Sequence, residues 1–255
     1  MARSEIENRV QTTTFDRPES RNAFTAEAAR ELAEAIDHAE RNDVRALVLT
    51  GEGEAFSAGG DLEEMAARQE TPHEAYRRYQ GTLNAMIEGI LTAPFPVIAK
   101  VNGDAVGAGT NVAAACDFVI ADEEARFGEV FVNVGLIPDS GGTFILPALV
   151  GLRKAKELAM TGKIFDAETA EELGLINEAV PGDELDGTVD ELLGTLSEKP
   201  TETLGLTKRG FHENLGSSYA EALETEANLQ VLCYGSEAHE EGVDAFLNDR
   251  EPEFE

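Results

Sequence analysis

The sequence has little positive charge, two cysteines and no tryptophan. Its 255 residues include 20 lysines and arginines against 50 aspartates and glutamates, which gives a formal net charge of −30. Nucleic acids and anionic membrane surfaces are bound by basic faces that neutralise phosphate groups. The composition therefore argues against a nucleic-acid partner and against a membrane partner.

Disulfide frameworks and long apolar runs are also missing from this sequence. Cys116 and Cys233 are too few for a disulfide framework. The apolar stretches fall far short of the ~20 residues that a membrane-spanning helix needs. The opening segment MARSEIENRV has no apolar signal-peptide region. We therefore expect a cytoplasmic protein, in a reducing compartment.

The acidic residues are spread along the chain and do not form a tail. Hydrophobic residues make up 42% of the chain, which is enough for a sizeable core. The acids therefore indicate a solvated surface. Such a surface suits a cytoplasm of very high salt, where screening removes the repulsion between like charges. This leads to the hypothesis of a halophilic protein.

Strand-like and helix-like segments alternate through the first 200 residues, which is typical of an α/β fold. The strands are expected at 10–15, 44–50, 96–101, 117–121 and 175–180. The helices are expected at 25–41, 61–93 (with an interruption near Thr71-Pro72), 107–116 and 167–173. Thr25 and Asp166 are the expected N-caps of the first and last of these helices.

The character of the chain changes after Pro200. Residues 201–247 read as helical throughout, with apolar residues on two faces and no strand candidate. We therefore divide the chain into a core, 1–200, and a helical region, 201–255. A helix that is apolar on two faces must pack against something else, and another subunit is the expected partner.

No metal site or nucleotide-binding loop is predicted. The four histidines are scattered through helical segments without ligand spacing, so no metal ligands are assigned. Gly107-Ala108-Gly109 resembles part of a dinucleotide fingerprint, but the third glycine is missing.

Two glycine-rich turns each connect a strand to a helix. They are Phe56-Ser57-Ala58-Gly59-Gly60-Asp61-Leu62 and Gly107-Ala108-Gly109-Thr110. The first N–H groups of a helix have no partner within the helix. Two such donors that converge on one point form an oxyanion hole for a thioester enolate. The alternative is that both segments are only tight turns.

A third motif, Gly135 to Thr143 with the sequence GLIPDSGGT, contains Asp139. Asp139 has two interpretations. It is either an N-cap of the following helix or a general base whose pKa is raised by an apolar loop around it.

Several long motifs together resemble the crotonase, or enoyl-CoA hydratase/isomerase, family. They are AFSAGGDLEEM (55–65), PVIAKVNGDAVGAGT (96–110), ACDFVIADEEARFG (115–128), GLIPDSGGTFILPALVG (135–151), TGKIFDAETAEELGLINEAV (161–180) and EGVDAFLNDREPEF (241–254). The resemblance implies a ββα spiral core with a C-terminal α-helical trimerisation region, assembled as a homotrimer or a dimer of trimers. It also implies an acyl-CoA substrate with no further cofactor, and Gly60 and Ala108 as the oxyanion-hole donors.

The reaction type depends on side chains, and here the sequence departs from the hydratase pattern. Asn111 and Phe131 stand where hydratases of this family carry two glutamates. Glu129 would project to the same face as Phe131 if the segment were a strand. The stretch VFVNVGLIPDSGGT (130–143) is most similar to the 1,2-epoxyphenylacetyl-CoA isomerase and Δ3-Δ2-enoyl-CoA isomerase branch, which uses an aspartate at the position of Asp139. The dehalogenase branch also carries this aspartate, but it needs a tryptophan, which the chain lacks.

The resemblance also suggests which residues contact the substrate. Arg21 and Lys208 are candidate phosphate contacts, and the alternative is that both are ordinary surface charges. The residues expected around the adenine, the pantetheine and the acyl group are Ala58, Asp61, Leu62 and Phe131. The apolar residues expected to line the acyl pocket from the helix 61–93 are Met65, Leu83, Met86 and Ile87.

These features predict an enoyl-CoA isomerase in which Asp139 carries a proton between two carbons. Two other hypotheses remain open. One is a hydratase of unusual design that uses Glu129 or Asp139, and the other is a catalytically silent member that only binds coenzyme A.

Overall fold

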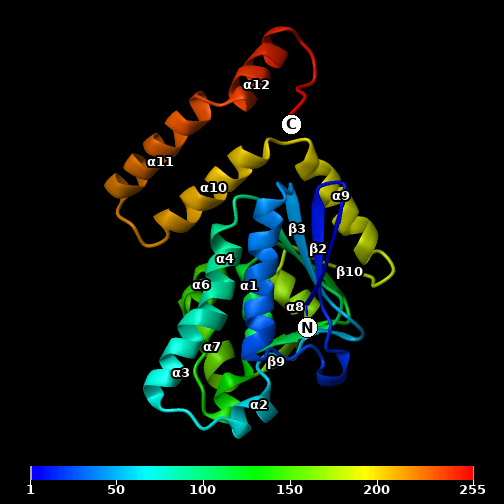
Figure 1. Cartoon of the computed structure of the whole chain (residues 1–255), viewed down its shortest axis with the longest axis vertical. Coiled ribbons are helices and arrows are strands. Elements are labelled where there is room, and N and C mark those ends of the chain that lie inside the picture. Colours follow the sequence, from blue (N-terminus) through cyan, green and yellow to red (C-terminus); the bar gives the residue numbers. More distant parts are fainter. Residues whose placement is uncertain (1, 255) are drawn as a thin grey trace.

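The computed structural model describes residues 2–254, which form two sheets surrounded by helices (Figure 1). The larger sheet has six strands. In order across the sheet they are β1 (Ala2–Glu7), β2 (Val10–Phe15), β3 (Ala46–Gly51), β5 (Val97–Val101), β7 (Phe118–Asp122) and β10 (Glu178–Val180). The β1–β2 pair is antiparallel and the other pairs are parallel.

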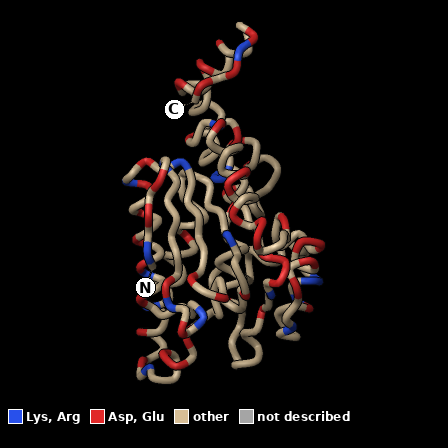
Figure 2. The backbone as a smooth tube through the Cα atoms, turned by 90° about the vertical axis from the view of Figure 1, so that its right-hand side faces the viewer, with Lys and Arg blue, Asp and Glu red and all other residues tan. Residues whose placement is uncertain are grey.

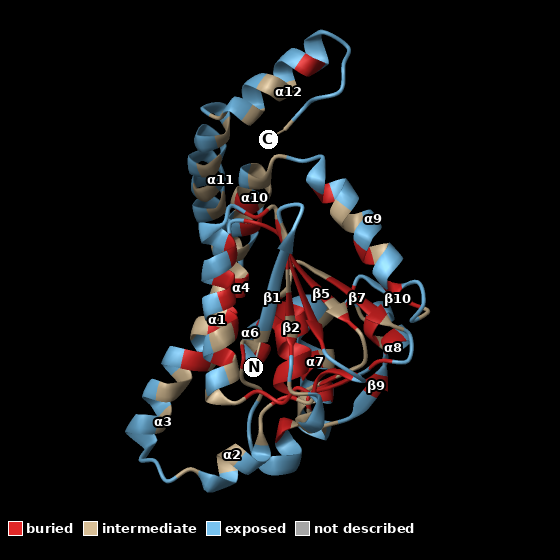
Figure 3. Ribbon diagram, turned by 45° about the vertical axis from the view of Figure 1, so that its right-hand side comes forward, coloured by how far each residue is buried: buried red, intermediate tan, exposed pale blue. Residues whose placement is uncertain are grey.

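The inner strands are apolar because helices cover both faces of the larger sheet. On one face, Leu47 and Leu49 of β3 pack with Leu32 and Ile36 of α1 (Ala26–Arg41) in the main core. Helix α4 (Ala85–Thr92) packs beside α1 on this face. On the other face, alternate residues of β3, β5 and β7 pack against α9 (Leu185–Ser197). Figure 3 shows the buried residues concentrated in the strands and on the inner sides of these helices.

The smaller sheet has four strands of three residues each, in the order β4 (Ala55–Ser57), β6 (Asp104–Val106), β8 (Arg126–Gly128) and β9 (Ile164–Asp166). The chain alternates between the sheets: β3 leads to β4, β5 to β6 and β7 to β8, and helical structure follows each pair. This repeating unit of two strands and a helical segment is the predicted ββα arrangement.

Three groups of helices follow these strand pairs. After β4 come α2 (Leu62–Ala67), α3 (Pro72–Tyr79), a π-helical turn (Gln80–Asn84) and α4. After β6 comes α5 (Ala108–Ala115). After β8 come a 3-10 helix (Val130–Val134), α6 (Gly142–Val150) and α7 (Leu152–Thr161), and then β9 leads into α8 (Ala167–Glu172).

The two predicted helix caps are confirmed. The Thr25 hydroxyl accepts a hydrogen bond from the Ala28 N–H at 3.0 Å, and the Asp166 carboxylate accepts one from the Thr169 N–H at 2.9 Å. The single helix predicted over 61–93 is divided, because α3 has its own cap, in which Thr71 and Glu74 form a capping box around Pro72. Strand β1 and the four short strands of the smaller sheet were not predicted.

The last three helices are α10 (Thr201–Asn214), α11 (Tyr219–Tyr234) and α12 (Glu237–Leu247), and they extend away from the two sheets (Figure 1). This confirms that residues 201–247 are helical. Helix α10 packs on α4, whereas α11 buries none of its residues and α12 buries only Ala245. Much of the apolar surface of these helices is therefore exposed in the single chain.

Charge is distributed as the sequence indicates. Figure 2 shows acidic residues along the outer helices and loops, while the strands in the interior carry few charges. Among residues 2–254, no helix is both long and apolar enough to cross a bilayer.

Candidate active site

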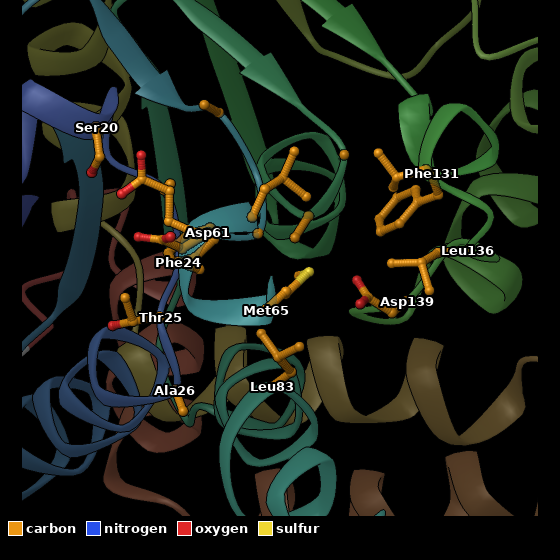
Figure 4. A pocket seen from close by; sticks show the side chains of 18 of the residues that line it. Ser20, Phe24, Thr25, Ala26, Asp61, Met65, Leu83, Phe131, Leu136 and Asp139 are labelled. Atoms are coloured by element: carbon orange, nitrogen blue, oxygen red, sulfur yellow. The ribbon is translucent and has the colours of Figure 1, made fainter. Parts of the chain in front are cut away.

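A cavity of about 680 Å³ lies between the smaller sheet and helices α2 and α3. Its wall is built from five segments of the chain, within 17–26, 58–68, 78–83, 107–108 and 130–139. In Figure 4, Asp139 and Leu136 lie on one side of the cavity and Thr25 and Asp61 on the other. Met65 lies between them. The cavity thus brings together all three motifs that the sequence analysis singled out.

The two glycine-rich turns pack against each other at the edge of the cavity. Gly59 has a φ of +85°, and a Cβ there would lie 2.6 Å from the Val106 carbonyl oxygen and 3.2 Å from the Ala108 nitrogen. A Cβ on Gly109 would overlap the Ser57 carbonyl oxygen. Both glycines are needed because the backbones approach too closely for a side chain.

This close approach places two unpaired donors on one cavity wall. Gly60 and Ala108 both line the cavity. Neither backbone N–H has a hydrogen-bond acceptor in the described part of the chain, whereas the neighbouring N–H groups of Gly59, Asp61 and Gly107 are all bonded. Two unpaired N–H groups at adjacent strand-to-helix turns can stabilise an oxygen that gains negative charge.

Asp139 also faces the cavity, and most of its surroundings are protein. Its carboxylate accepts hydrogen bonds from the Ser140 hydroxyl at 3.1 Å and from the Tyr79 hydroxyl at 3.4 Å. Burial raises the pKa of Asp139 above its ordinary value, because a carboxylate loses hydration there. A raised pKa makes the ionised carboxylate a stronger base.

The alternative interpretation, that Asp139 is a helix cap, is wrong. The N-cap of α6 is Gly141, and the helix has no side-chain cap. The Asp139 side chain is therefore free of a helix-capping role and is directed at the cavity (Figure 4).

The sequence of the chain matches the family model described as Enoyl-CoA hydratase/isomerase over residues 5–255. The chain belongs to this family. It is 38% identical over 252 residues to a "Probable enoyl-CoA hydratase" from Rhodobacter capsulatus, covering 99% of this chain and 96% of the relative. It is also 38% identical over 253 residues to the 1,2-epoxyphenylacetyl-CoA isomerase of Escherichia coli, covering 98% of this chain and 97% of the relative.

The fold agrees with solved structures of the enoyl-CoA hydratase/isomerase family. An enoyl-CoA hydratase from Polaromonas sp. superposes with a TM-score of 0.92 at 34% sequence identity, covering 100% of this chain and 99% of that one. The crotonase-type α/β fold predicted from the motifs is thereby confirmed.

Of the nine site residues predicted from the sequence, seven line the cavity. They are Ala58, Gly60, Asp61, Leu62, Ala108, Phe131 and Asp139. Asp61 also caps α2, and its pKa is lowered by the Glu64 N–H and by Arg17.

The other two predicted site residues do not line the cavity. Arg21 has a left-handed φ of 52°, and its exposed guanidinium pairs with Asp104. Lys208 is not an ordinary surface charge. Its side chain is 6% exposed, and its ammonium forms an ion pair with Asp117 at 2.7 Å.

Three arginines at the cavity were missed by the sequence analysis, namely Arg17, Arg68 and Arg78. Each pairs with a carboxylate, Asp61, Glu64 and Glu70 respectively. The segment DRPESR (16–21) contains two arginines, and the sequence does not show which of them faces the cavity. The conformation of the turn places Arg17 there.

The acyl-pocket prediction is half right. Met65 and Leu83 line the cavity, but Met86 and Ile87 are buried in the main core and do not reach it. Leu83 lies in the π-helical turn, whereas Met86 and Ile87 follow it in α4.

Glu129 and Asn111 lie behind the cavity wall. The segment at Glu129 is not a strand: the residue precedes the 3-10 helix, its side chain is fully buried, and it does not line the cavity. Asn111 on α5 is buried too, and its Nδ2 donates to the Asp139 carbonyl oxygen at 2.9 Å. Within residues 2–254, no group of three or more potential ligands is placed to hold a metal ion.

Proposed function

We propose that this member of the family is an enoyl-CoA isomerase, with Asp139 as its single acid-base group. The observation that carries the proposal is the cavity itself. It places one half-buried carboxylate, whose pKa is raised by the partial burial, together with two unpaired backbone N–H groups. The positions where hydratases of this family carry glutamates hold Asn111 and Phe131 instead.

The reaction requires the movement of one proton. With a 3-enoyl thioester, the Asp139 carboxylate removes a proton from C2, and the electron pair of that C–H bond moves to give a dienolate. The N–H groups of Gly60 and Ala108 stabilise its oxygen, which carries the new negative charge. Asp139, now neutral, returns the proton to C4, so the double bond moves from C3–C4 to C2–C3 and the carboxylate is restored.

The coenzyme A portion of the substrate carries several phosphate charges. In this proposal Arg17 and Arg68 at the cavity attract these phosphates, although the chain as a whole is strongly acidic. Guanidinium groups bind phosphate oxygens in a bidentate manner. Both arginines are already held by carboxylates, which fixes their positions before the substrate arrives.

The relative from Escherichia coli is named an isomerase and the one from Rhodobacter capsulatus a probable hydratase. The second candidate function is therefore water addition. Glu129 does not reach the cavity, so a hydratase reaction would have to use Asp139 alone. A single carboxylate of this kind suits proton transfer between two carbons better than the activation of water.

The test is a panel of 2-enoyl, 3-enoyl and ring-containing acyl-CoA substrates, assayed at high salt. The proposal predicts double-bond movement from the 3-enoyl substrates, followed by absorbance of the conjugated thioester and by NMR. A product that is one water heavier, from a 2-enoyl substrate, identifies a hydratase. Binding without either reaction, and without exchange of the C2 proton into deuterated water, identifies a silent binding protein.

We also propose that the protein assembles as a homotrimer or a dimer of trimers through its last three helices. The support is the exposure of large apolar side chains there, such as Phe211, Tyr219, Val231 and Phe246. A monomer rarely leaves an apolar surface of this extent in water. Sedimentation at high salt tests this, and a monomer across all concentrations contradicts it.

A further inference from the structure

The structure contains a second buried acid next to Asp139 that the proposed reaction does not use. Glu129 is completely buried behind the cavity wall. Its Oε2 lies 3.5 Å from the Nδ2 of Asn111, and that same nitrogen donates to the Asp139 carbonyl at 2.9 Å. Asn111 therefore connects the buried acid to the catalytic loop.

The connection is incomplete in one respect. Only four buried side-chain polar atoms among the described residues lack a hydrogen-bond partner, and two of these are Glu129 Oε1 and Asn111 Oδ1. An ionised carboxylate with a buried, unpartnered oxygen is strongly disfavoured. A neutral carboxyl group needs fewer hydrogen bonds to replace its lost hydration, so the surroundings favour the protonated form of Glu129.

The orientation of Asn111 is fixed by its neighbours. The Asp139 carbonyl can only accept hydrogen bonds, so the amide nitrogen must face it. On the other side, the carboxamide occupies space that exists because residue 142 is a glycine, where a Cβ would overlap it. Asn111 therefore fits tightly between Glu129, Gly142 and the Asp139 backbone.

The loop that Asn111 holds needs such support. Ser140, which follows Asp139, is buried and has a φ of +49°, and Gly141 has a φ of +77°. A non-glycine residue in the left-handed region is strained and persists only where contacts enforce it. Here the Asp139 carbonyl accepts two hydrogen bonds, from Asn111 and from the Gly142 N–H at 2.8 Å.

We propose that Glu129 and Asn111 form a positioning pair for Asp139, and that the charge of Glu129 controls the reaction that Asp139 performs. The inference rests on the proposed function. A neutral Glu129 leaves the site ready to form a dienolate. An ionised Glu129 adds a buried negative charge near Asp139 and opposes the negative charge that develops on the substrate.

The groups that could titrate around this pair are few. Burial raises the pKa of Glu129 to about 7, with the nearby Asp139 contributing. On the far side of Asp139 are Tyr79 and Arg78; burial raises the pKa of Tyr79 and pairing with Glu70 raises that of Arg78, so neither changes charge near neutral pH. Glu129 and Asp139, whose pKa is also raised by burial, are therefore the two groups at this site that can change charge, and a variant at residue 129 isolates the contribution of Glu129.

The test is the pH dependence of kcat for the wild type and for Glu129→Gln, which keeps the shape but cannot ionise. We expect the ionisation of Glu129 to lower wild-type activity as pH rises, so that the ratio of variant to wild-type activity rises about tenfold from pH 6 to pH 8, as expected for one ionisation near pH 7. The ionisation of Asp139 occurs in both proteins, so the ratio is the quantity compared. Glu124→Gln, at an exposed position in the same segment, should keep the wild-type profile. A constant ratio for Glu129→Gln means that Glu129 is only structural and overturns the inference.

A second variant, Gly142→Ala, tests the role of Asn111 if Glu129→Gln does not fold. The new methyl group displaces the Asn111 carboxamide, whose hydrogen bond lowers the pKa of Glu129. We expect a lower kcat with KM little changed, and a fall in activity that starts at a higher pH. An unshifted profile contradicts the inference. If the wild type itself catalyses no isomerisation, the proposed function is contradicted. This result differs from an unshifted pH profile, which contradicts only the inference about Glu129 and Asn111.

Discussion

At the scale of single residues, the proposals rest on two carboxyl groups, the half-buried Asp139 and the fully buried Glu129. Asp139 and Glu129 both have raised pKa values because burial removes their hydration. Only Asp139 reaches the cavity. The sequence pointed to Asp139, because it follows a proline in a glycine-rich motif. It could not show that Glu129 is fully buried, because no local pattern shows that this residue precedes a 3-10 helix and does not lie in a strand.

The buried Glu129 should make stability depend on pH. Its pKa of about 7 in the folded protein exceeds the ordinary value of 4.5, so folding loses stability as pH rises from about 4.5 through 7. Relative to Glu129→Gln, we expect the wild type to lose roughly 2 to 3 kcal/mol of unfolding free energy between pH 5 and pH 8. Denaturant unfolding of both proteins at the two pH values measures this difference. A difference that does not change with pH would show that Glu129 ionises normally.

Arg68 should contribute to substrate binding more than to the chemical step. It lines the cavity and pairs with Glu64, and it makes no hydrogen bond to Asp139. Arg68→Gln should raise KM for an acyl-CoA by about tenfold and leave kcat nearly constant, because a phosphate contact is equally strong before and during the reaction. Arg209→Gln, an exposed position on α10, is the control. A drop in kcat at unchanged KM contradicts this assignment.

At the scale of elements, the site is made by contacts between turns. The sequence predicted five of the six strands of the larger sheet and two helix caps, because burial patterns and caps are local signals, as at Thr25 and Asp166. It did not predict the smaller sheet, since three-residue strands such as β4 and β6 carry no detectable periodicity. Nor could the sequence show that Arg17, and not Arg21 of the same turn, faces the cavity.

The contact between the two glycine-rich turns can be tested directly. In Gly109→Ala, the new methyl group overlaps the Ser57 carbonyl and forces the turns apart. We expect a loss of about 1 to 3 kcal/mol in unfolding free energy, together with a large loss of kcat as Gly60 and Ala108 separate. Gly194→Ala in α9 has open space around it and should be neutral or stabilising by about 0.5 to 1 kcal/mol. Full activity in Gly109→Ala would mean that the spacing of the turns does not matter.

At the scale of the whole molecule, the net charge affects how another subunit can cover the exposed helices. The chain carries −30 formal charges, and most of its acids lie on the outside (Figure 2). The apolar faces of α10 to α12 remain open in the single chain (Figure 3). A subunit that covers these faces must approach against like charge, which dissolved salt screens.

The stability of the protein should therefore rise with salt concentration. With 50 acids against 20 basic residues, repulsion between surface charges opposes folding in dilute buffer. We expect the unfolding temperature, measured by calorimetry, to increase from low salt to molar salt. A Tm that is unchanged or higher in low salt contradicts the halophilic hypothesis.

The central claim is that Asp139 alone moves the proton, and one rate comparison tests it most directly. A 3-enoyl-CoA is supplied to the wild type and to Asp139→Asn, and formation of the conjugated 2-enoyl product is followed. The account predicts a loss of at least about a hundredfold in kcat for the variant, the contribution expected of a general base, with acyl-CoA binding retained. Equal rates in the two proteins would contradict it.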